Sequence, residues 1–282
     1  MKALLISLVS ICQFAVLHGQ EPLSREEALK QLYDHYDAAK NTANWICVKG
    51  QEHAAWPCWT EYSTVSISVL LVAQVQEQGV EKTYLAASAK PGSAPLGYEC
   101  HACRPAIGVA VFAWKAPHWV LQSANLAVGF FGGWGDPPGV DLVEIGSNKY
   151  GVLVSTDDMA QGFAWSQKHL FINVATTIDE VWSIQDEQDN LGAVDSDDKL
   201  NKEVAYRSSA AFRFSADYQE ANSSSDYFDI EVISRGTDRE DYSHPLKQEN
   251  WTEVYRFSNG KYRLLRHTDF VETKNDGKKS PR

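Results

Sequence analysis

The hydrophobic pattern of the chain begins with apolar residues at helical spacing, just after an apolar leader. The stripe comprises Ala28, Leu29, Leu32, Tyr33, Tyr36 and Ala39. Such spacing puts the apolar side chains on one face of an α-helix. Ser24 and Glu27 have the spacing of a capping box, and Leu23 has the position of a hydrophobic staple. We therefore predict one amphipathic helix over residues 25–40.

From residue 63 onward the pattern changes to short apolar runs that are rich in β-branched and aromatic residues. Gly, Pro, Asn and Asp separate these runs, which is typical of strands joined by turns. The predicted strands are 64–75, 82–89, 106–114, 118–128, 140–146, 150–155, 168–175, 178–184, 204–214, 226–234, 251–257 and 261–270. Most connections are short, so we expect neighbouring strands to pair antiparallel as hairpins.

The clearest hairpin lies near the C-terminus, where Asn259-Gly260 separates two apolar runs. Asn-Gly readily supplies the two positive φ angles of a tight type I′ turn. No helical pattern lies between the predicted strands, which excludes a doubly wound α/β fold. We therefore predict a mainly β fold with one N-terminal helix. An antiparallel meander, a sandwich and an incomplete propeller-like β domain all fit the pattern.

The first 19 residues have the pattern of a secretory signal peptide. Lys2 is the single charge before an apolar run over residues 3–17, and Gly19 provides a small-residue exit. The run is too short to cross a membrane. We therefore predict a periplasmic or secreted protein with no membrane span, cleaved near Gly19. Acylation of Cys12 is the competing interpretation.

The remaining chain divides by pattern into three parts. Residues 20–97 hold the helix, a Cys-containing aromatic loop and the first strands, and residues 98–273 form the antiparallel β region. A stretch rich in Pro and Gly over residues 90–97 marks the boundary between them. Residues 274–282 contain no apolar residue, so we expect a disordered tail.

The chain is acidic, with a formal net charge of -11. Removal of residues 1–19 takes away Lys2 and no carboxylate, so the mature charge is -11 - 1 = -12. Such a protein repels phosphate groups, and we predict neither a nucleic-acid partner nor an anionic membrane surface. The sequence matches no dinucleotide or phosphate-binding glycine pattern, and we predict no cofactor.

Four cysteines remain after the leader: Cys47, Cys58, Cys100 and Cys103. An even number in an exported chain predicts two disulfides. Local closure favours the pairs Cys47 with Cys58 and Cys100 with Cys103, although sequence leaves the other two pairings open.

Cys100-His101-Ala102-Cys103 also has the spacing of a redox motif or of half a zinc site. A redox site of this kind needs a helix after the first cysteine, whereas a strand is predicted here. The other cysteine pair is separated by ten residues, more than a zinc site usually allows. We therefore predict a structural disulfide and no metal site, with redox and metal chemistry as alternatives.

A Gly- and Pro-rich loop over residues 129–139 carries the candidate binding residues. These are Phe130, Phe131, Trp134 and Asp136. Aromatic side chains on such a loop can stack on sugars or fill a partner's pocket. The alternative is that the aromatics fold back and close the end of the β structure.

Other candidate chemistry is weaker. The acidic stretch from Asp186 to Lys202 does not match an EF-hand, so we expect a solvated surface loop. A looser calcium site there is the alternative. The chain has neither a Gly-x-Ser-x-Gly elbow nor a His-Glu-x-x-His motif, so no catalytic residues are assigned.

Several segments between residues 98 and 270 resemble a set of uncharacterised exported bacterial β-rich proteins. The matching segments are Cys100–Cys103, Ile107–Phe112, Trp119–Leu121, Trp134-Gly135, Ile145-Gly146, Tyr150-Gly151, Asp189-Asn190-x-Gly192, Tyr227–Ile230, Gly236-Thr237 and Phe257–Tyr262. The resemblance implies an envelope or secreted location and brings no activity with it.

Together these features favour a binding or inhibitory module that contacts a protein or glycan in the envelope or extracellular space. The aromatic loop would be its contact surface, and an inhibitor of a basic enzyme is one form that such a module takes. The alternative is a hydrolase of envelope polymers that uses carboxylates the sequence does not single out.

Overall fold

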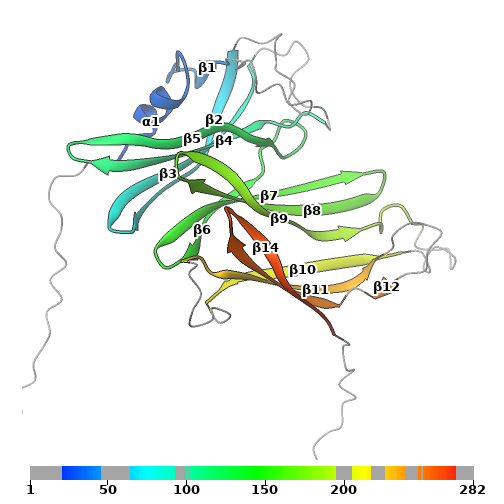
Figure 1. Cartoon of the computed structure of the whole chain (residues 1–282). Helices are drawn as coiled ribbons and strands as arrows, with labels where there is room; N and C mark the ends of the chain where they lie inside the picture. The colour runs from blue at the N-terminus through cyan, green and yellow to red at the C-terminus, as the bar shows by residue number, and fades with distance from the viewer. Residues whose placement is uncertain are drawn as a thin grey trace, which may run out of the picture.

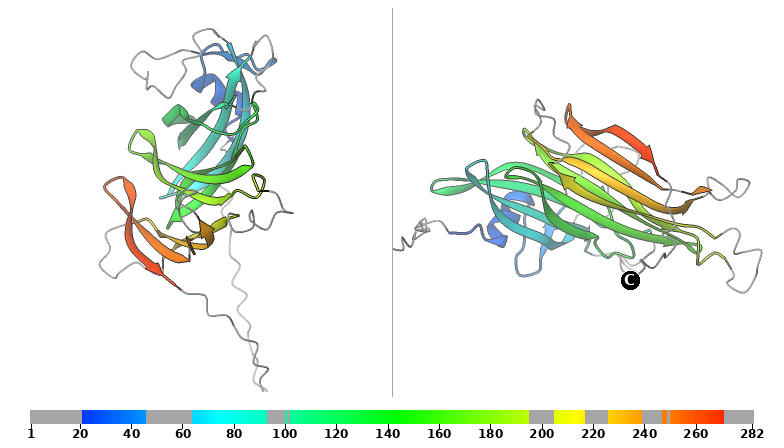
Figure 2. Two further views of the ribbon diagram at one scale, coloured as in Figure 1. Left: turned by 90° about the vertical axis from the view of Figure 1, so that its right-hand side faces the viewer. Right: turned by 90° about the horizontal axis from the view of Figure 1, so that it is seen from below.

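The computed structural model describes residues 21–45, 64–92, 100, 102–194, 205–216, 226–238, 247–248 and 250–270. They form two antiparallel sheets and one short helix, which confirms the predicted mainly β fold (Figure 1). In both sheets the strand order largely follows the order along the chain, so the architecture is that of a meander. Figure 2 shows the sheets as successive layers of the molecule.

The helix α1 covers Arg25–Leu32 and is shorter than predicted. The capping box is present, with the Glu27 N–H donating to Ser24 Oγ over 3.2 Å. Tyr33 leaves the helix in an extended conformation because its ring is buried against the first sheet. Asp37 then accepts the N–H of Ala39, which closes a turn before the next strand. Residues 33–40 of the predicted helix therefore form turns, although their apolar residues continue the helical spacing.

The first sheet lies between α1 and the second sheet. Its strands are β1 (Thr42–Asn44), β2 (Thr64–Glu77), β3 (Val80–Pro91), β4 (Ala106–Lys115) and β5 (His118–Phe130). Leu29 of the helix packs in one cluster with Ile67 and Phe112. On the other face Tyr84 packs in a cluster with Phe171 of the second sheet. Covering on both faces explains why β4 is buried along nearly its whole length.

The first sheet also spans the predicted boundary at residue 97. Ala89 of β3 pairs with Ala106 of β4, so these strands are neighbours in one sheet. The two sheets divide within residues 131–138, between β5 and the first strand of the second sheet.

The second sheet contains the rest of the described strands. They are β6 (Gly139–Gly146), β7 (Lys149–Ala160), β8 (Phe163–Val174), β9 (Thr177–Asp189), β10 (Arg207–Ser215), β11 (Asp229–Asp238), β12 (Lys247–Gln248), β13 (Trp251–Ser258) and β14 (Lys261–Asp269). The sheet curls on itself. This is seen in the β-bridge between Gly146, at the end of β6, and Tyr227, close to β11. A core that includes Ile145, Leu170, Trp182 and Ile230 fills the curl.

The predicted acidic loop starts later than expected. Residues 186–189 belong to β9, where Asp186 is buried, accepts a hydrogen bond from Ser166 and lies 3.4 Å from Lys168 Nζ. The expectation of a solvated loop from Asp186 was therefore wrong at its N-terminal end, because these partners compensate the buried charge. Residues 195–204 lie outside the described part of the chain, as do residues 274–282 of the predicted tail.

The hairpin of β13 and β14 gives a testable dependence of stability on pH. His267 Nδ1 lies 2.9 Å from Glu253 Oε1, and its Nε2 lies 3.2 Å from Asp269 Oδ1. These two hydrogen bonds raise the pKa of His267 above its usual 6.5. A raised folded pKa means that the stabilisation is fully present below the unfolded pKa and is lost as pH rises through the folded pKa.

We therefore expect the His267→Gln variant to lose more thermal stability relative to the unsubstituted protein at about pH 5.5 than at about pH 8.5. Thermal unfolding followed by circular dichroism measures the two differences in Tm. A loss of Tm that is the same at both pH values, or larger at about pH 8.5, would show that His267 has no such linkage.

Candidate functional site

The four candidate residues of the 129–139 loop have different environments. Phe130 is the last residue of β5 and packs against the first-sheet core. The Phe131 ring lies 4.6 Å from the His169 ring and 6.1 Å from the Phe171 ring, between the sheets. Trp134, by contrast, is 59% exposed, and Asp136 is exposed as well. The two phenylalanines thus pack inward, and the tip of the loop presents an indole and a carboxylate.

Backbone contacts hold Trp134 in position. Its φ angle is +56°, a left-handed conformation that bulky residues rarely adopt. The N–H of Gly133 donates to Asp136 O over 3.2 Å, and the N–H of Asp136 donates back over 2.9 Å. The N–H of Gly135 donates to Cys103 O over 2.7 Å. These bonds on both sides of Trp134 compensate the local strain and fix where the indole projects.

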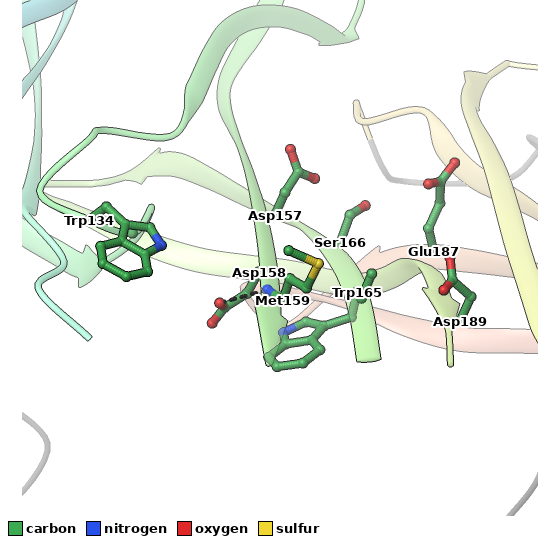
Figure 3. Close-up of a pocket in the computed structure, with 10 residues that line it drawn as sticks. Trp134, Asp157, Asp158, Met159, Trp165, Ser166, Glu187 and Asp189 are labelled. Atoms are coloured by element: carbon green, nitrogen blue, oxygen red, sulfur yellow. Dashed lines mark hydrogen bonds between the residues drawn. The ribbon is translucent and has the colours of Figure 1, made fainter. Parts of the chain in front are cut away.

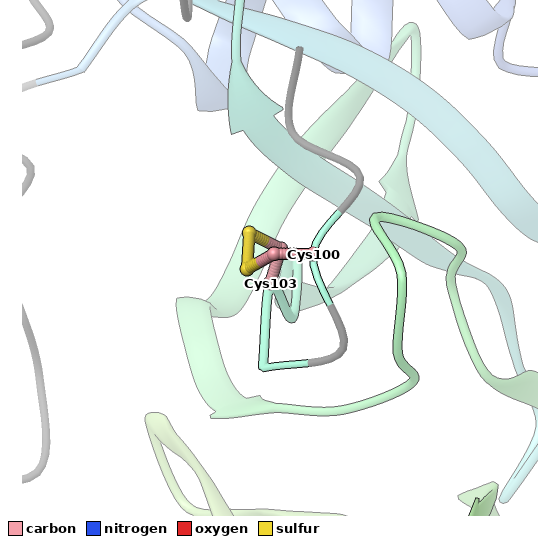
Figure 4. The surroundings of a disulfide bond; sticks show 2 residues. All are labelled: Cys100 and Cys103. Atoms are coloured by element: carbon pink, nitrogen blue, oxygen red, sulfur yellow. A yellow bond between two sulfur atoms is a disulfide. The ribbon is translucent and has the colours of Figure 1, made fainter. Parts of the chain in front are cut away.

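The Cys100–Cys103 turn, shown in Figure 4, contacts this loop through the hydrogen bond from Gly135 to Cys103. The two sulfur atoms are joined at 2.07 Å, and the Cys103 N–H donates to Cys100 O over 2.8 Å. The next residue, Arg104, forms an ion pair with Asp158 of β7. The turn and the residue that follows it therefore contact both the Trp134 loop and β7 of the second sheet.

Cys47, Cys58 and His101 lie outside the described residues, so their predicted roles stay predictions. Within the described ranges, no group of three or more His, Cys, Asp and Glu side chains is arranged to hold a metal ion.

Trp134 stands beside a hollow of about 550 Å³, which we call the Trp134 hollow (Figure 3). The loop, the β7–β8 hairpin and the end of β9 form its walls. Its lining includes the apolar side chains of Trp134, Met159 and Trp165 and the carboxylates of Asp157, Asp158, Glu187 and Asp189. A volume of this size suits one small molecule or one side chain with its neighbours.

Strand register determines which side chains share a face of the sheet. Asp157 lies opposite Ser166, which in turn lies opposite Glu187, so these three side chains form one row. Figure 3 shows all three extending in the same direction. Asp158 lies opposite Trp165 one position further along, and successive residues of a strand point to opposite faces. Asp158 and Trp165 therefore share the other face.

The loop lies over the face that carries Trp165. The N–H of Gly132 donates to Thr156 Oγ1 over 3.1 Å, and Thr156 shares a face with Asp158. A Cβ at Gly132 would lie only 2.1 Å from Asp136 O, so a residue without a side chain is needed at this close approach. Two indoles, Trp134 and Trp165, consequently line one hollow together with Asp158.

This arrangement offers apolar faces beside carboxylates. An indole face binds the apolar face of a sugar, an apolar side chain or a cation, and it loses little conformational entropy on binding. The Asp158 side chain is 12% exposed and already paired with Arg104. Asp157, Glu187 and Asp189 add negative charge around the hollow.

Sequence reasoning found Trp134 but missed Trp165 and Asp158. Both lie in the part of the β7–β8 hairpin that extends beyond the predicted strands. The sequence signal for this hairpin was the pair Gln161-Gly162. Both residues have positive φ angles, as in a tight hairpin turn.

Comparison with known proteins adds no further assignment. No protein-family model, no curated protein and no solved structure matches the chain. Among the helices of the described residues, none has the length and apolar character needed to span a membrane.

Proposed function

We propose that this protein is an exported binding module that contacts a protein or glycan of the envelope or extracellular space through the Trp134 hollow. The observation that carries the proposal is the 59% exposed Trp134, held in a left-handed conformation at the rim of a hollow that Trp165 also lines. Tryptophan is enriched among the few interface residues that carry most of the binding energy, and such residues commonly lie at pockets.

Export is supported by the leader pattern of residues 1–19 and by the even number of cysteines that follow it. The resemblance to exported bacterial β-rich proteins points to the same location, in the periplasm or outside the cell. An acidic surface also speeds association with basic partners, so inhibition of a basic enzyme is one form of the proposed function.

The test is affinity capture from a native envelope or secretion extract, with mass spectrometry and glycan analysis of the eluate. Trp134→Ala should lower the yield of the captured partner by about 30-fold, because a central tryptophan contributes about 2 kcal/mol or more. Leu264→Ala is the matched control, since Leu264 is 52% exposed on β14, away from the hollow. Equal capture by the unsubstituted protein and a folded Trp134→Ala variant would refute the proposal.

Hydrolysis of an envelope polymer is the second candidate function. It is favoured by Asp157 of β7 and by Glu187 and Asp189 of β9, three carboxylates that line the same hollow from two strands separated by β8. Paired carboxylates at suitable separation cleave glycosidic bonds. Release of soluble fragments from envelope polymer by the purified protein, abolished in Asp157→Asn or Glu187→Gln, would favour the hydrolase over the binding module.

A further inference from the structure

A second cavity lies far from Trp134 in the chain, where the helix and both sheets meet. It has a volume of about 530 Å³ and is lined from the end of α1, from β1, from β5 and from the start of β9. Its apolar lining consists mainly of Leu32, Tyr33, Trp45, Leu126, Ala127 and Ile178. Pockets that bind small molecules have this size and commonly lie where structural layers meet.

A bulge in β5 forms one wall of the cavity. Ile107 pairs with Gly129 while Val109 pairs with Asn125, so three residues of β5 lie opposite Gly108 alone. Leu126 and Ala127 belong to this bulge and line the cavity. Bulges redirect side chains and are frequent next to functional sites.

Asn125 holds the bulge and ties it to the second sheet. Its Oδ1 accepts the N–H of Ala127 over 3.1 Å, and its Nδ2 donates to Ile178 O over 3.4 Å. The wall is thus fixed on both sides by one amide side chain. A cavity whose walls are tied in this way is formed before a ligand arrives, which lowers the cost of binding.

Tyr33 belongs to the lining, and its hydroxyl is enclosed beside Gly108. Tyr33 is 4% exposed, and its hydroxyl has no hydrogen-bond partner among the described residues. Burial raises the pKa of this hydroxyl, so it stays protonated. A Cβ at Gly108 would lie 3.0 Å from the hydroxyl oxygen, so the space next to it depends on glycine. A buried donor without a partner is unusual in native structures.

The rim of the cavity is acidic. Asp34 and Asp179 are exposed lining residues, and no lysine or arginine is among the described residues of the lining. The exposed His35 lies beside this rim, with its Nε2 3.6 Å from Asp34 Oδ2. Two carboxylates above an apolar floor attract a positive group and repel a negative one.

From these features we infer that the cavity binds a small amphipathic cation, with its apolar body on Leu126 and Ile178 and its ammonium group between Asp34 and Asp179. This site is separate from the Trp134 hollow and does not depend on the proposed partner. A fatty-acid anion, which would suit the apolar floor alone, is disfavoured by the two rim carboxylates.

Three probes with one apolar body and different charges test the inference: tryptamine, tryptophol and indole-3-propionate. Isothermal titration calorimetry of the full mature chain should show saturable binding of tryptamine. Tryptophol should bind about tenfold more weakly than tryptamine, and indole-3-propionate should bind more weakly than tryptophol. Asp34→Asn combined with Asp179→Asn should remove most of this preference for the cation while tryptophol binding persists.

Ala127→Leu places extra volume in the cavity and should abolish binding of all three probes, with Leu264→Ala as the unaffected control. Circular dichroism establishes that each variant is folded. Three outcomes would overturn the inference: no saturable tryptamine binding, a preference for the anion, or unchanged tryptamine binding in the folded Ala127→Leu variant.

Discussion

Replacing Arg256 by alanine should lower the free energy of unfolding by about 3–5 kcal/mol. The Asp229 side chain is fully buried, and Arg256 is the partner that compensates its charge. Arg256 Nη2 lies 2.9 Å from Asp229 Oδ2, and Arg256 Nε lies 3.2 Å from Oδ1. Removal of the guanidinium leaves a buried carboxylate without compensation, which costs far more than loss of a surface ion pair.

Urea denaturation of the mature chain measures this loss. Arg263→Ala is the matched control, because Arg263 is the exposed residue that pairs with Arg256 across the β13–β14 hairpin. Its loss should stay within about 0.5 kcal/mol. If the two variants lost equal stability, the buried pair would not have the structural role assigned to it.

Phe171→Ala should destabilise the protein by a similar amount, about 3–5 kcal/mol. Phe171 is 2% exposed and lies in the core that joins the two sheets. Its removal opens a cavity between them and also takes away one aromatic neighbour of Phe131 in the candidate loop. Chemical denaturation quantifies the loss, and Leu265→Ala on the exposed surface of β14 is the control. A loss below about 1 kcal/mol would mean that the sheets do not depend on this core.

The strands could be predicted because their pattern and their turns agree. Alternating apolar residues and the Asn259-Gly260 turn identify the last hairpin without tertiary information. The helix end could not be predicted, since Tyr33 and Tyr36 continue the helical spacing. Burial of Tyr33 against the first sheet decides its conformation, and that contact is not visible in a local pattern.

The candidate site was predictable only in part. Glycines and prolines around Trp134 mark an aromatic loop, but they do not show that Phe131 packs on His169. The polar residues Asp157 and Asp158 hide the extension of β7, so the sequence placed no strand there and Trp165 was not assigned to the site. The register between β7 and β8 is the information that was missing.

The central claim is that the Trp134 hollow is the contact surface, and indole N–H signals in a ¹⁵N-labelled protein test it most directly. Trp→Phe variants assign the signals of Trp134, Trp165 and Trp251, and Trp251 on β13 does not line the hollow. Addition of the fraction eluted from affinity capture should shift or broaden the Trp134 and Trp165 signals and leave Trp251 unchanged. A captured partner that perturbs Trp251, while Trp134 and Trp165 stay unchanged, would contradict the account.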